Sequence, residues 1–82
     1  LGAAAQAAGL AADWRKVNPG DADFTTPGPA RFWLFTLKAL AFLNLRHGQR
    51  EATAELLAQL RLLDPQDNLG AGVVEALLAQ SA

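Results

Sequence analysis

Residues 32–45 form a nearly unbroken apolar segment, which constrains the fold more than any other feature of the chain. The polar members of this segment are Thr36, Lys38 and Asn44. Gly48 follows it closely, and a second, amphipathic run then occupies residues 49–63. A run that is apolar around most of its circumference predicts a helix covered by neighbours on several sides. Together the two runs predict a helical hairpin over residues 30–63.

The ends of this hairpin carry recognisable signals. Pro29 suits a first helical turn, where its missing N–H costs nothing. Gly48 suits the left-handed position that follows a helix, so we expect it to have a positive φ. We therefore expect one helix over residues 29–47 and another over residues 49–63. A small residue at Ala41 predicts that the two helices approach each other closely there.

Two further helices are expected beside the hairpin. The Ala-rich start, residues 1–18, predicts a helix over residues 3–17. Its larger apolar residues are spaced by four and three positions and would share one face: Leu10, Trp14 and Val17. Residues 20–29 are rich in Pro, Gly, Thr and Asp and predict a loop, with Phe24 as a plug over the core. A terminal helix is expected over residues 65–80, capped by Asp64. The fold class is thus all-α, with three to four helices in antiparallel hairpins.

Length and composition limit the possibilities further. The chain of 82 residues is expected to form a single small domain, and its start at Leu1 without any Met suggests a piece of a longer protein. It lacks Cys, which excludes disulfides and thiol chemistry. Its formal net charge is −1, so nucleic acid and anionic membranes are not expected as partners. The apolar segment is shorter than the roughly 20 residues that a membrane span needs. We expect a cytoplasmic protein.

The hairpin resembles the tetratricopeptide repeat, a helix–turn–helix unit of about 34 residues. The residues that carry the resemblance are Ala41, Gly48, Ala52 and Pro65. The family's preferred Trp and Tyr are replaced here by Leu37 and Asn44, and one full unit is present, with partial units on either side. The resemblance implies a scaffold that binds protein partners on the inner face of the first helix of each unit.

Catalytic and metal-binding patterns are not evident. His47 is the single His and Ser81 the single Ser, so no nucleophile and base pair can be assembled. The Asp residues lack the spacing of a Ca²⁺ loop and are better explained by turns and caps. We therefore expect no enzyme activity, no cofactor and no metal site.

A candidate partner-binding surface lies on the apolar segment. Lys38, Phe42 and Arg46 recur every four residues, and the resemblance places them on the groove-lining face. The full set of candidate partner-binding residues is Trp33, Phe35, Lys38, Phe42, Leu45 and Arg46. Two cations around an aromatic ring can hold a carboxylate against an apolar base. The alternative is that the apolar members are core and the cations extend to water.

These observations predict a protein-interaction scaffold. A small accessory or regulatory subunit of an enzyme, with the apolar helix face as a permanent interface, is the alternative. The apolar residues of the second helix exceed what its neighbours can cover, so we expect an exposed patch in which Trp33 or Phe35 contacts a partner. That partner is a protein or peptide, with a second copy of the chain as another candidate.

Overall fold

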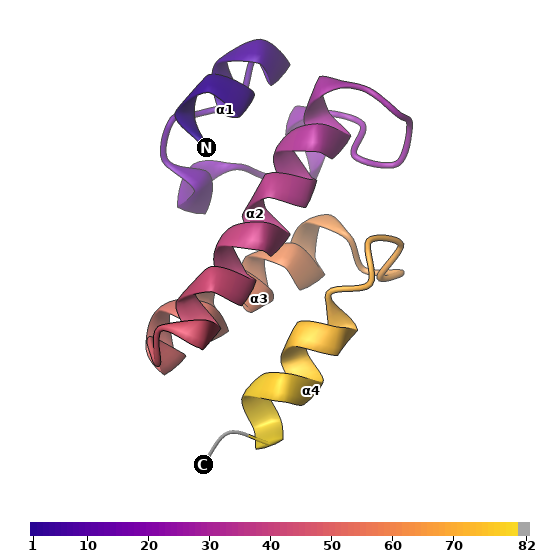
Figure 1. Ribbon diagram of the computed structural model, residues 1–82. Helices are drawn as coiled ribbons and strands as arrows, with labels where there is room; N and C mark the ends of the chain where they lie inside the picture. The colour runs from indigo at the N-terminus through magenta and orange to yellow at the C-terminus, as the bar shows by residue number, and fades with distance from the viewer. Residues whose placement is uncertain (81–82) are drawn as a thin grey trace.

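The computed structural model describes residues 1–80, and over this range all regular secondary structure is helical (Figure 1). The α-helices are α1 (Gly2–Ala8), α2 (Pro29–Arg46), α3 (Arg50–Leu63) and α4 (Gly72–Gln80). Two 3₁₀ turns, η1 (Trp14–Lys16) and η2 (Pro19–Asp21), lie between α1 and α2. The predicted all-α class is confirmed.

Helices α2 and α3 form the predicted hairpin, with bounds within a residue of those expected. Gly48 has φ 74°, which is the left-handed conformation that a residue without Cβ adopts most readily. The N–H of Gly48 donates to the carbonyl of Leu45 at 3.1 Å, and that of Gln49 donates to Asn44 at 2.9 Å. These bonds satisfy carbonyls at the end of α2 that have no partner inside the helix. The predicted positive φ at Gly48 is therefore confirmed.

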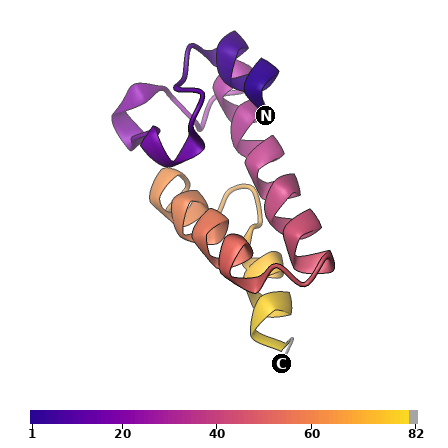
Figure 2. The ribbon, with the colours of Figure 1, turned by 90° about the vertical axis from the view of Figure 1, so that its left-hand side faces the viewer.

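The helices are arranged in two layers. Helices α2 and α4 lie on one side and run in roughly the same direction, whereas α3 runs antiparallel to them behind (Figures 1 and 2). Helix α1 packs against the N-terminal half of α2. The second helix therefore contacts every other α-helix in the described part of the chain, and its outer side faces away from α3.

A single core holds the layers together. Its buried residues are Ala5, Val17, Phe24, Trp33, Leu34, Leu37, Ala41, Leu56, Leu57, Leu60, Leu63, Ala71 and Val74. Trp33, Leu37 and Ala41 are fully buried and lie on one side of α2, at the helical spacing of four. As expected, Phe24 leaves its loop to cover this core, with its ring 5.9 Å from that of Trp33.

The first helix is shorter than predicted, because it ends at Ala8 rather than at residue 17. Gly9 adopts the left-handed conformation with φ 69°, and the N–H of Leu10 donates to the carbonyl of Ala5 at 2.9 Å. This closure satisfies a terminal carbonyl, while continuing the helix would have placed a glycine in its interior. The prediction that Leu10, Trp14 and Val17 share one helical face is wrong.

The segment after α1 is attached to α3 by side chains instead. Gln59 donates from Nε2 to the carbonyls of Trp14 at 3.1 Å and Val17 at 2.7 Å. Arg15 forms an ion pair with Glu55, with 2.8 Å between Nε and Oε2. Val17 is consequently only 1% exposed although it lies outside any helix. Val17 therefore joins the core, and Leu10 and Trp14 pack partly against it.

The terminal helix also begins later than predicted, at Gly72 rather than at residue 65. Asp64 accepts backbone N–H groups of Asn68 and Leu69, each at 3.0 Å, and thereby shapes a turn instead of capping a helix. Asp67 has φ 55° and accepts the N–H of Gly72 at 3.1 Å. A left-handed residue cannot continue a right-handed helix, so residues 64–71 form a connector. It places α4 beside α2.

Gly48→Ala should reduce the free energy of unfolding by about 1 kcal/mol, because alanine is strained at this φ. No heavy atom lies within 4 Å of the position that a Cβ would occupy at Gly48, so the effect is conformational rather than steric. Gly20→Ala is the matched control, since its Cβ position is also open and its φ is not left-handed. Urea denaturation of the variants measures the difference. Equal losses for both substitutions would contradict the role of Gly48.

Ala41→Leu should cost about 1–3 kcal/mol by overpacking the contact between α2 and α3. Ala41 is 0% exposed, so the added atoms have no access to solvent. Ala58→Leu adds the same atoms at an exposed position of α3 and should be close to neutral. Thermal unfolding, monitored by circular dichroism, gives the melting temperature of each variant. An unchanged melting temperature for Ala41→Leu would contradict close helix packing at this point.

Candidate functional site

The outer side of α2 and the adjacent side of α4 expose several large apolar side chains. These residues are Phe32, Phe35, Phe42, Leu43, Val73 and Leu77. Phe32 is 61% exposed and Val73 is 67% exposed. On α2, Phe32, Phe35 and Phe42 are separated by three and seven positions, so they form a stripe opposite the one that enters the core. We call this surface the α2/α4 face.

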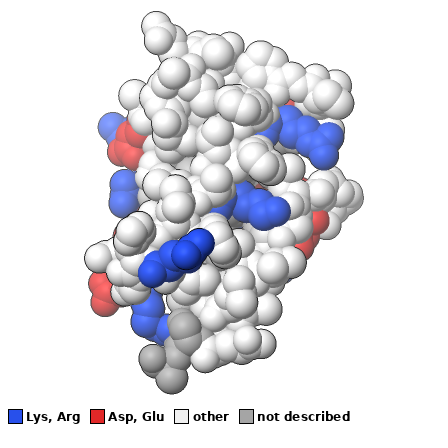
Figure 3. All heavy atoms as spheres, in the orientation of Figure 1, with Lys and Arg blue, Asp and Glu red and all other residues white. Residues whose placement is uncertain are grey.

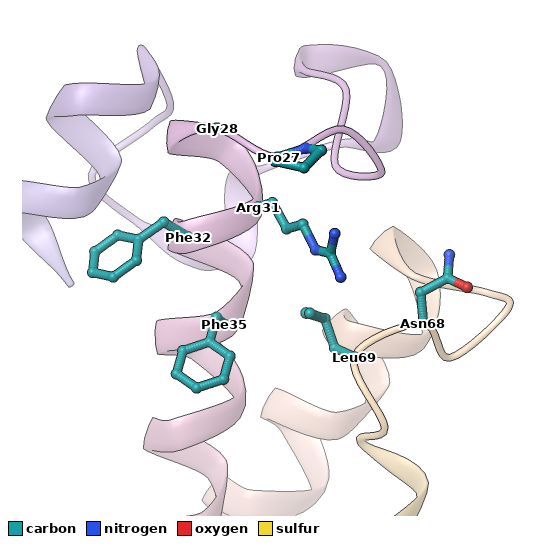
Figure 4. Close-up of a pocket in the computed structure, with 7 residues that line it drawn as sticks. All are labelled: Pro27, Gly28, Arg31, Phe32, Phe35, Asn68 and Leu69. Carbon is teal, nitrogen blue, oxygen red and sulfur yellow. The ribbon is translucent and has the colours of Figure 1, made fainter.

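A first hollow, the connector hollow, lies where the N-terminal half of α2 meets residues 64–71 (Figure 4). It encloses about 470 Å³ and is lined by Pro27, Gly28, Arg31, Phe32, Phe35, Asn68 and Leu69. The Arg31 side chain extends from α2 toward Leu69 and Asn68, while Phe32 and Phe35 project from the outer side of the helix (Figure 4). The guanidinium group of Arg31 therefore points toward the connector, away from the ring of Phe32 (Figure 4).

A second hollow, the helix hollow, continues along the same face between α2 and α4. It encloses about 300 Å³ and is lined by Phe35, Lys38, Ala39, Phe42, Val73 and Val74. Phe35 belongs to both hollows, so they adjoin at this ring. Lys38 is half-buried and donates from Nζ to the carbonyl of Leu69 at 2.7 Å. This hydrogen bond fastens the connector to α2 and thereby sets the width of the helix hollow.

The α2/α4 face is electrically positive although the whole chain has a net charge of −1. Helix α2 contains Arg31, Lys38 and Arg46 and no Asp or Glu. Figure 3 shows basic side chains across this side of the molecule, within a largely uncharged surface. The Arg46 guanidinium lies over the ring of Phe42, 6.0 Å from its centroid, which is within the range of a cation–π contact.

The carboxylates near this face are engaged in contacts of their own. Glu75 on α4 accepts from Arg61 on α3, with 3.0 Å between Nε and Oε2. That hydrogen bond raises the pKa of Arg61. Asp64 and Asp67 accept backbone N–H groups inside the connector. These carboxylates hold α4 and the connector in place, and none of them lines either of the two hollows.

The loop that leads into α2 is held by Asp23. Its carboxylate accepts the hydroxyl groups of Thr25 and Thr26, each at 2.6 Å, and the backbone N–H of Thr25. The Thr25 hydroxyl is the main cause that holds the pKa of Asp23 well below its usual range. The carboxylate thus stays ionised at neutral pH, and its stabilising effect is lost only as the pH falls through that lowered pKa. The loop ends at Pro27 and Gly28, which line the connector hollow.

The predicted partner-binding residues divide between this face and the core. Phe35, Lys38 and Phe42 come together in the helix hollow, and Arg46 lies beside Phe42. Trp33 is fully buried, so the prediction that it contacts a partner is wrong. Leu45 is half-buried against the core and lines neither hollow. Trp33 lies on the opposite side of α2 from Phe35, since two positions along a helix correspond to a rotation of about 200°.

Sequence reasoning missed several residues that line these hollows. Phe32 belongs to the exposed stripe and the half-buried Arg31 precedes it, so both could have been found by extending the helical spacing toward Pro29. Asn68 and Leu69 could not, because they reach the site through the irregular connector. Val73 lies on α4, whose position beside α2 depends on that connector.

Other kinds of site have little support in residues 1–80. No group of three or more His, Cys, Asp or Glu side chains is arranged there to hold a metal ion. None of the described helices is both long enough and apolar enough to span a membrane. His47 is exposed at the end of α2, where its backbone N–H donates to the carbonyl of Leu43 at 3.1 Å.

Comparisons with protein-family models, with curated proteins and with solved structures found no match for this chain.

Lys38→Met should loosen the connector and α4 without unfolding the hairpin. The substitution retains an apolar stem but removes the hydrogen bond to the carbonyl of Leu69. Backbone amides of α4 should therefore exchange with deuterium faster, while those of α2 and α3 keep their protection. Lys16→Met, at an exposed position far along the chain, is the control. Unchanged exchange in α4 would show that the Lys38 contact does not position this helix.

Proposed function

We propose that this chain is a non-catalytic protein-binding module and that the α2/α4 face is its binding surface. The observation that carries the proposal is the group of exposed apolar side chains, Phe32, Phe35, Phe42 and Val73, that lines two adjoining hollows. Contiguous apolar surface of this kind is costly to leave in water and usually marks an interface. Its central residue is Phe35, which is 53% exposed and lines both hollows.

The arrangement of the helices supports a scaffold of tetratricopeptide type. In such a scaffold the first helices of successive units lie side by side and line the ligand groove. Here α2 and α4 would be those first helices, since they share a layer and a direction while α3 lies behind them (Figures 1 and 2). The helix hollow lies between α2 and α4, where such a groove is expected. The cytoplasmic location stays a prediction from the sequence.

The alternative, a permanent subunit interface in an enzyme assembly, uses the same surface. The two functions differ in whether the chain remains folded and soluble when it is alone. A core of buried hydrophobic residues that draws on α1, α2, α3 and α4 supports a module that folds by itself. Exposed aromatic side chains with a cation nearby also favour a surface that is in contact with water when no partner is bound.

A displayed library of random peptides, each about four helical turns long, tests the proposal. Peptides selected on the wild-type chain should lose at least about tenfold in affinity for a Phe35→Ser/Val73→Ser variant, because both apolar contacts are removed. Leu62→Ser is the matched control, since Leu62 on α3 is 51% exposed, close to the 53% of Phe35, and lines neither hollow. It should leave the affinity unchanged.

Circular dichroism on each variant checks that the substitutions leave the fold intact. Selected peptides that bind the double variant as well as the wild type would overturn the proposal. So would repeated selections that give no binding peptide.

A further inference from the structure

We infer that the partner of the α2/α4 face is an acidic amphipathic α-helix of another protein. This inference rests on the proposed function and specifies the chemistry of what binds there. Its apolar side would lie against Phe35, Phe42 and Val73, and its carboxylates would meet Arg31, Lys38 and Arg46. Two features of the face carry the argument: its charge and the helices that wall it.

The charge of the face selects an acidic partner. Arg31 borders the connector hollow, Lys38 borders the helix hollow, and Arg46 lies beside Phe42. Within the described chain no carboxylate lines either hollow, and Glu75 on α4 is paired with Arg61. A partner with carboxylates at the rim would gain attraction from these cations, whereas a basic partner would be repelled.

The same charge disfavours a second copy of the chain as the occupant. A twofold symmetric dimer places the same patch on both sides of the interface. Arg31, Lys38 and Arg46 of one copy would then face the positive surface of the other. Like charges in a desolvated contact oppose binding, so the face is better suited to a different chain.

The shape and chemistry of the face select a helix. The exposed stripe runs from Phe32 to Leu43, which corresponds to about 16 Å along α2. The walls of the helix hollow come from α2 and from the first turn of α4, where the N–H of Val73 donates to the carbonyl of Gly70 at 3.2 Å. An extended peptide would find no strand edge to pair with, while a helix satisfies its own backbone and presents apolar side chains at spacings of three and four.

An anionic membrane is the occupant that competes with this partner. Exposed aromatic residues beside cations can also insert into a bilayer surface. The vesicle measurement described below separates a membrane from a helical partner.

The test uses the tightest peptide selected from the library above and a charge-swapped copy in which every Asp and Glu is replaced by Lys. The selected peptide should be acidic, with apolar residues at helical spacing, and should become helical on binding. The wild-type chain should prefer it over the charge-swapped copy by at least about tenfold in fluorescence anisotropy titrations. Raising the ionic strength from about 0.05 M to about 0.5 M should reduce this preference.

Matched variants of the chain show which residues cause the preference for an acidic peptide. Arg31→Glu should weaken binding of the acidic peptide by about tenfold and strengthen binding of the charge-swapped copy. A carboxylate near the start of α2 is favourable to the helix dipole, so this variant should fold normally. Lys16→Glu changes the net charge equally at an exposed position outside α2 and should have little effect.

The outcomes distinguish this inference from the proposed function. Peptides that depend on Phe35 but are basic, charge-insensitive or non-helical when bound would overturn the acidic helix and leave the protein-binding module standing. Failure to obtain any peptide whose binding depends on Phe35 would overturn both this inference and the proposed function. Binding to phosphatidylserine vesicles that is lost in Phe35→Ser, or dimerisation through this face in light scattering, would also overturn the inference.

Discussion

The structure depends on the burial of one side of α2. Trp33, Leu37 and Ala41 are withdrawn completely from solvent on this side, and α1, α3 and the loop residue Phe24 pack around it. Burial of apolar surface is the main favourable contribution to folding, and in a domain of this size few other sources are available. The chain has no Cys and so no disulfide to supplement it. The other elements can therefore be understood as cover for this stripe.

That constraint also explains the exposed face. A helix with apolar residues around most of its circumference cannot be covered completely by three short neighbours. Ala41 is fully buried on one side of α2, and the small side chains of α1 add little area beyond it. Phe32, Phe35 and Phe42 are consequently left outside. The same amino-acid composition thus produces the core on one side of α2 and a candidate binding surface on the other.

The connector gives the apolar α2/α4 face its shape. Asp64 and Asp67 hold their own backbone in a fixed turn, and Lys38 reaches across to the carbonyl of Leu69. These polar contacts place α4 beside α2 and create hollows with a cationic border. Polar hydrogen bonds therefore determine the geometry of a surface whose binding energy would be mainly apolar.

The sequence by itself determined the all-α class, the hairpin and the positive φ of Gly48, because helical periodicity, proline and glycine act over a few neighbouring residues. It also grouped Phe35, Lys38 and Phe42, since helical spacing assigns residues to a common face, and all three line the helix hollow. Only the tertiary structure decided which face of an almost wholly apolar helix is buried, and it placed Trp33 inside and Phe35 outside. It likewise decided the early end of α1 at Gly9 and the late start of α4, where local hydrogen bonds outweighed helix propensity. These outcomes depend on contacts between residues far apart in the chain or on competition between nearly equal local conformations, and periodicity in the sequence carries no information about either.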